Sequence, residues 1–146
     1  MKYIKWKGLP DEAAKKAYED GYYIEAIQNL HGYLENQARS LLMLVGCVHF
    51  ESKQSEVWDL SDTISLNDAL KVLRVLNQIT DEEYSKFKRF NSLRNKIVHQ
   101  FFKEPYEKQY LGVPKRDFDE VFQETQREVY FFTEKCEAII GKAHNK

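Results

Sequence analysis

Proline, glycine and cysteine are scarce in this chain of 146 residues, and long hydrophobic runs are missing. Three prolines and six glycines allow long helices and argue against β architectures that need many tight turns. The two cysteines, Cys47 and Cys136, match no metal-ligand spacing, so we expect reduced thiols, no metal and no cofactor. The longest apolar run, LLMLVGCV at 41–48, is too short to span a bilayer, which predicts no membrane association.

The remaining composition is that of a globular protein. Hydrophobic residues make up 42% of the chain, charged residues 31%, and the net charge is −1. The first residues, MKYIKWKGLPDEAAKK, contain no apolar segment of signal-peptide length. We therefore expect one cytoplasmic domain over residues 1–146.

Apolar periodicity predicts helices along most of the chain. We expect helices over 11–20, 22–49, 66–79, 80 to about 102, and 116–142, with loops at 50–65 and 103–114 and no strand. Ser65 is a predicted N-cap, and Thr80 with Glu83 forms a predicted capping box. These elements predict an all-α protein, an antiparallel up-and-down helical bundle of four to five helices.

Polar residues interrupt the apolar faces of two predicted helices. At about 100° per residue, Arg94 falls inside the apolar stripe of its helix, while Asn95 and His99 lie on the flank of that stripe. His31 and Glu35 fall inside the stripe of the second helix. Because a buried charge is costly unless it is paired, Arg94 and Glu35 either meet or line a wet cleft or subunit interface.

Each of these intrusions also has a purely structural interpretation. A buried Arg94–Glu35 pair that only fixes helix register is as good an explanation as a functional one. A lone histidine on an apolar face, such as His31, is usually a satisfied core residue.

Basic residues concentrate in the same helix. The stretch from 85 to 103 contains no acid and six basic residues: Lys86, Lys88, Arg89, Arg94, Lys96 and Lys103. Such a strip on an acidic body suits a phosphate backbone. An ordinary solvated face that is balanced by acids on a neighbouring helix explains the pattern equally well.

The segment RNKIVH, at 94–99, resembles the motif of the HEPN superfamily (higher eukaryotes and prokaryotes nucleotide-binding domain). That motif is an arginine, four to six residues and a histidine, often with asparagine directly after the arginine; here the matching residues are Arg94, Asn95 and His99. The resemblance extends over about residues 10–142, but only the motif region is specific. It implies a helical bundle that dimerises and brings two copies of the motif into one cleft.

The resemblance also implies an activity. Many family members are metal-independent RNases, often toxins paired with a small nucleotidyltransferase antitoxin. In the subgroup that this partner modifies, a tyrosine stands two residues after the histidine, whereas this chain has Phe101 there, so that modification is not expected.

Residue chemistry assigns a role to each candidate in an RNase. His99 would transfer protons, Arg94 would stabilise the phosphorane charge, and Asn95 would orient His99 or hold a phosphate oxygen. One histidine cannot be both acid and base, and Arg94 and His99 are roughly 140° apart around the helix, so we expect a composite site in a homodimer. The expected RNA-binding residues are Lys88, Lys96 and Arg89, supported by Glu35 and His31.

Two other functions stay open. The first is a non-catalytic module that binds nucleotide or docks to a small nucleotidyltransferase. The second is a helical scaffold, suggested by the A-x-x-x-Y…Y-x-x-A-I pattern at 14–27, in which Arg94 is paired in the core and His99 faces solvent. Trp58, in the predicted 50–65 loop, could belong to a partner surface.

Overall fold

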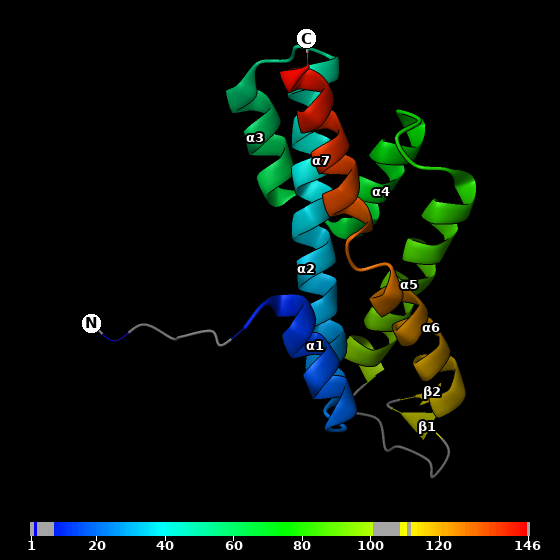
Figure 1. The fold of residues 1–146 in the computed structure, drawn as a ribbon. Coiled ribbons are helices and arrows are strands. Elements are labelled where there is room, and N and C mark those ends of the chain that lie inside the picture. The colour runs from blue at the N-terminus through cyan, green and yellow to red at the C-terminus, as the bar shows by residue number, and fades with distance from the viewer. Residues whose placement is uncertain (1, 3–7, 101–108, 111, 146) are drawn as a thin grey trace.

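The computed structural model describes residues 2, 8–100, 109–110 and 112–145. The all-α fold class is confirmed, and the buried apolar side chains of the helices form one core cluster. The long helix α2 (Tyr23–Leu44) runs through the middle of the molecule, with the shorter helices arranged along it (Figure 1). Its buried face repeats at helical spacing, as predicted: Ala26, Ile27, Leu30, Leu34, Ala38, Leu41 and Leu42.

Helix α1 (Pro10–Glu19) packs antiparallel to the first half of α2. Proline occupies its first turn, where its missing N–H costs nothing. The helix ends at Gly21, whose φ of +83° only glycine adopts without strain. The amide of Tyr22 then donates to the carbonyl of Ala17 at 2.8 Å, which closes a Schellman turn and directs the chain into α2.

Helices α4 (Leu66–Val75) and α5 (Asp81–Gln100) pack against α2 and against each other. Both predicted caps are confirmed. The Ser65 hydroxyl accepts from the Asp68 amide at 3.1 Å. Thr80 and Glu83 exchange side-chain to backbone hydrogen bonds at 2.8 and 3.2 Å. These caps fix where α4 and α5 begin, and therefore which of their side chains face α2.

The prediction of a loop over 50–65 was wrong for most of its length. After the π-helical turn η1 (Val45–His49), the chain forms α3 (Gln54–Thr63), which packs on α2 and η1. Val57 approaches Gly46 so closely that a Cβ there would lie 2.9 Å from it. Most other α3 side chains are exposed, Trp58 and Leu60 among them, so the segment has no apolar period to detect.

The predicted final helix is two helices, α6 (Lys115–Arg127) and α7 (Phe131–His144). The break carries no proline or glycine, and buried Val129 and Phe132 continue the apolar pattern across it, which is why the sequence suggested one helix. Phe132 packs on Phe87 of α5, with ring centroids 4.7 Å apart.

One further difference lies just before α6. A two-residue antiparallel pair, β1 (Gln109–Tyr110) and β2 (Val113–Pro114), interrupts the predicted loop where no strand was expected. The predicted end of the fourth helix near Phe102 lies outside the described residues. The two cysteines are thiols, as expected.

Candidate functional site

A polar pocket of about 580 Å³ opens between α2, the start of α4, and α5. Nearly all of its lining side chains are polar, in contrast to the apolar core beneath it. We call it the Arg94 pocket, and it is lined by Gln28, His31, Gly32, Glu35, Ser65, Leu66, Asn67, Asn91, Arg94 and Asn95.

Helical spacing explains why these side chains share one pocket. Gln28, His31 and Glu35 repeat every three or four residues, so they line one face of α2. Asn91 and Asn95 are four residues apart on α5, with Arg94 between them. Four of the residues singled out in the sequence, Arg94, Asn95, His31 and Glu35, are therefore brought together. Of the two arrangements expected for Arg94 and Glu35, the shared cleft is the one that forms.

Arg94 is half-buried and is held by neutral partners. Its Nε donates to Oε1 of Gln28 at 3.0 Å, and its Nη1 donates to Oδ1 of Asn95 at 3.1 Å. Among the described residues, no carboxylate forms an ion pair with it. Amide oxygens orient the guanidinium without cancelling its charge, and three of its five N–H groups remain for another acceptor. A phosphate that takes two of these in parallel matches guanidinium geometry.

Glu35 does not hold Arg94, contrary to its expected supporting role. Its Oε1 lies 3.3 Å from Nη2 of Arg39, one turn along α2. Its Oε2 accepts the amide of Leu66 at 3.0 Å. The carboxylate thus satisfies the first amide of α4 and complements the positive end of that helix. It positions α4 and contributes one negative charge to the pocket.

His31 is a satisfied core histidine, as the structural interpretation predicts. It is only 7% exposed, and its Nε2 shares a hydrogen bond of 3.0 Å with Oδ1 of Asn91. Burial lowers its pKa, and the nearby positive charge of Arg94 adds to this, although the bond to Asn91 opposes it. The imidazole is therefore neutral at pH 7, so it offers the pocket a hydrogen-bonding group and no charge.

His99 lies apart from the Arg94 pocket. It is exposed near the end of α5 and is not among the residues that line the pocket. Within the ranges that the structure describes, it makes no hydrogen bond or ion pair. Phe101, two residues after His99, and Lys103, the last cation of the basic strip, lie outside the described residues.

The basic strip on α5 is partly neutralised by α6 and the turn after it. Nζ of Lys86 lies 2.7 Å from Glu128, and Nη2 of Arg89 lies 2.5 Å from Glu124. The hydrogen bond to Glu128 raises the pKa of Lys86. Balancing acids on a neighbouring helix were the alternative explanation of the strip, and for these two residues that explanation holds.

Lys88 and Lys96 differ from those two cations. Lys88 extends over the ring of Tyr84, 5.6 Å from its centroid. Lys96 is exposed, and with Arg89 it lines a separate hollow of about 350 Å³ that also contains Asp117 and Glu120. None of the three predicted RNA-binding residues lines the Arg94 pocket.

The neutral polar residues of the pocket were not predicted from the sequence. Asn91 could have been found, because it stands one helical turn before Arg94 and Asn95 on the same helix. Gln28 could have been found in the same way, because it stands one turn before His31 on α2. Ser65 and Asn67 carry no such signal, since only the packing of α4 on α2 brings them to the pocket.

Searches of protein-family models, of curated proteins and of solved structures each found no match to this chain. In the part of the chain that the structure describes, no three His, Cys, Asp or Glu side chains are grouped so that they could hold a metal ion. None of the described helices is long and apolar enough to cross a membrane.

Proposed function

We propose that the chain is a metal-independent endoribonuclease of HEPN type that acts as a homodimer, in a toxin or defence role. The observation that carries this proposal is the state of Arg94. Its guanidinium opens into a polar pocket, is oriented by two amide oxygens, and keeps its full positive charge. Such a group is suited to binding the phosphate that RNA cleavage must stabilise.

The chemistry requires no metal, because RNA carries its own nucleophile. The 2′-oxygen forms a bond to phosphorus while the bond to the 5′-oxygen breaks. A base removes the proton of the 2′-hydroxyl, and an acid protonates the departing 5′-oxygen. The products are a 2′,3′-cyclic phosphate and a 5′-hydroxyl. Arg94 would stabilise the negative charge that develops on the equatorial phosphate oxygens.

The base and the acid would be two copies of His99. One protomer supplies a single histidine on α5, the exposed His99, and buried His31 is neutral and already bonded to Asn91. A two-fold axis beside the end of α5 would bring both copies of His99 to one phosphate. Asn95 uses its oxygen on Arg94, which leaves its amide N–H groups for a phosphate oxygen.

The flanking RNA would follow the cations that lack acidic partners. Lys88 and Lys96 fit this description among the described residues, whereas Arg89 is paired with Glu124. We therefore assign Lys88 and Lys96 to backbone binding and expect a smaller contribution from Arg89.

The test is RNA cleavage in EDTA by the wild type, His99→Ala and Arg94→Ala, after matched unfolding curves show equal stability. We expect wild-type cleavage to leave 2′,3′-cyclic phosphate ends, and each substitution to lower the rate by about 10²–10³-fold. Sedimentation should give the mass of a dimer. Absence of wild-type cleavage, or full activity in both variants, would show that the chain is not this nuclease.

The position of His99 favours a second candidate. Because His99 lies outside the Arg94 pocket, the pocket alone can bind an anion, but its own histidine, His31, is buried and bonded to Asn91. This arrangement suits a non-catalytic module that binds a nucleotide phosphate, or that docks to a small nucleotidyltransferase. Nucleotide binding that Arg94→Ala abolishes, in a wild-type chain that cleaves no RNA, would establish the second candidate.

A further inference from the structure

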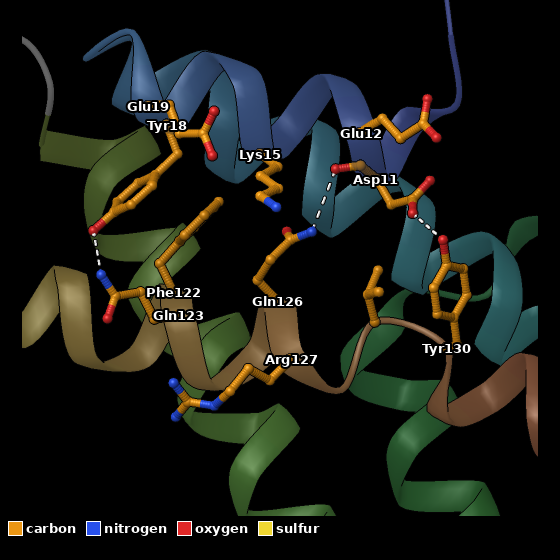
Figure 2. A pocket seen from close by; sticks show the side chains of 11 residues that line it. Asp11, Glu12, Lys15, Tyr18, Glu19, Phe122, Gln123, Gln126, Arg127 and Tyr130 are labelled. Carbon is orange, nitrogen blue, oxygen red and sulfur yellow. Dashed lines mark hydrogen bonds between the residues drawn. The ribbon is translucent and has the colours of Figure 1, made fainter.

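A second pocket, of about 600 Å³, lies between α1, α6 and the α6–α7 junction (Figure 2). It shares no lining residue with the Arg94 pocket, and the proposed nuclease mechanism does not involve it. We call it the Asp11 pocket. Asp11, Lys15 and Tyr18 come from α1, Phe122 and Gln126 from α6, and Tyr130 from the junction.

Asp11 is the unusual residue of this pocket. It is only 4% exposed, although carboxylates are rarely buried without a partner. Its Oδ2 accepts the hydroxyl of Tyr130 at 2.5 Å, and this bond raises the pKa of Tyr130 to about 12. Its Oδ1 has no hydrogen-bond partner among the described residues. The bond to Tyr130 explains how α1 is fastened to the junction, but it leaves one carboxylate oxygen buried and unsatisfied.

Gln126 adds a second unsatisfied acceptor. Its Nε2 reaches the backbone oxygen of Asp11 at 3.4 Å, and in Figure 2 its side chain rises from α6 toward α1. Its Oε1 is buried and likewise has no partner in the described part of the chain. Buried polar atoms are nearly always hydrogen-bonded, so two unsatisfied acceptors in one pocket indicate a missing donor.

The walls and the charge of the pocket limit what that donor is. Phe122 stacks on Tyr18 with centroids 4.5 Å apart, and these rings form an aromatic wall opposite Asp11. The charged lining residues are three acids, Asp11, Glu12 and Glu19, against Lys15 and Arg127. The unsatisfied groups are acceptors, the surplus charge is negative, and the wall is aromatic.

We propose that the Asp11 pocket binds a small organic cation, a primary ammonium on a short aromatic or aliphatic body. The ammonium would donate to Oδ1 of Asp11 and to Oε1 of Gln126, and the body would lie against Tyr18 and Phe122. An ammonium has three donors, which is enough for one bond to each acceptor, and its attraction to aromatic faces adds to the binding.

The probe is 2-phenylethylammonium, titrated calorimetrically into the full chain at neutral pH and low salt, with 2-phenylethanol as the uncharged control. We expect the ammonium to bind at one site and the alcohol to bind at least about tenfold more weakly, since it lacks the charge-assisted bond. Equal affinities, or no binding of the ammonium, would overturn the proposal.

Three variants separate a ligand site from a structural contact. Asp11→Asn keeps the shape but removes the charge and should weaken binding about tenfold or more. Tyr130→Phe removes the hydrogen bond between Tyr130 and Asp11 but keeps the Asp11 carboxylate. This variant should therefore bind the ammonium at least as tightly as the wild type. Asp62→Asn, on exposed α3, controls for net charge and should change nothing. Unweakened binding by Asp11→Asn, or equal weakening in Asp11→Asn and Tyr130→Phe, would contradict the proposal.

Should Asp11→Asn fail to fold, Gln126→Met removes the second acceptor at nearly constant length. It should weaken ammonium binding, although less than the loss of a charge would. Undiminished binding by this variant would equally contradict the proposal.

Discussion

Lys86 and Arg89 in the first half of α5, and Arg94 in the second half, all carry a positive charge, but their partners differ. The first two lie against Glu128 and Glu124, which cancel their charge locally. Among the residues that the structure describes, Arg94 bonds only to the neutral oxygens of Gln28 and Asn95. A count of basic residues along a helix therefore does not locate an anion site. What matters is which cations the neighbouring helices leave uncompensated.

Removing Arg94 should have the largest effect on RNA binding. With an RNA that carries a 2′-deoxy group at the cleavage site, Arg94→Ala should lose about 2–3 kcal/mol of binding free energy, since charge-assisted bonds are lost. Arg89→Ala should lose much less, because Glu124 already compensates that charge. Fluorescence anisotropy measures both. Comparable losses of binding free energy in the two variants would show that the two halves of α5 do not differ in RNA binding.

Glu35→Gln should change stability and binding in opposite directions. The free energy of unfolding should fall by about 1–2 kcal/mol, because the bond to the Leu66 amide weakens and the attraction to Arg39 is lost. RNA affinity should rise, since one negative charge leaves the Arg94 pocket. Urea unfolding and anisotropy give the two values, and Glu25→Gln, exposed on the same helix, is the control. A fall in RNA affinity would mean that Glu35 acts through the position of α4 rather than through its charge.

His31 should make stability depend on pH. Its folded-state pKa is lowered below the unfolded value of about 6.5, so below that pH the unfolded state binds more protons. The free energy of unfolding should therefore be highest above this pH and fall as the pH drops toward the folded-state pKa. Urea titrations between pH 5 and 8 should show this slope in the wild type and a flatter one in His31→Gln. His49→Gln, at an exposed position, should keep the wild-type slope.

The smallest effect should come from the first half of α5. Lys86→Met breaks the ion pair with Glu128 at the surface, and such pairs contribute less than about 1 kcal/mol. We expect a correspondingly small change in urea unfolding and little change in RNA affinity. A large loss of RNA affinity would show that the basic strip is central to RNA binding.

The helices that bury a regular apolar face were predictable, and those that do not were missed. The apolar stripe of α2 and the caps at Ser65 and Thr80 are local sequence patterns that do not depend on how the helices pack. Helix α3 buries little beyond Ser61, so its sequence resembles a loop. Helix α6 ends at Arg127 and α7 begins at Phe131, and no proline or glycine marks the break between them.

The same division holds for the candidate site. The helical projection placed Arg94, His31 and Glu35 inside the apolar stripes of their helices and Asn95 on the flank of one stripe, and these residues do share a pocket. It could not show that Glu35 turns to Arg39 and Leu66, or that Glu124 and Glu128 meet the basic strip, since those contacts depend on how the helices pack. Predicting which charges stay uncompensated requires the tertiary fold.

The most direct test of the central claim observes the arginine side chains themselves. The chain has six arginines, so their Nε–H signals can be assigned by substitution and followed by NMR. On addition of the 2′-deoxy-substituted RNA, we predict that the Arg94 Nε–H signal shifts and that Arg94→Ala removes this response, while the Arg89 signal moves little. A shift of Arg89 with Arg94 unchanged would show that RNA binds the basic strip and not the Arg94 pocket.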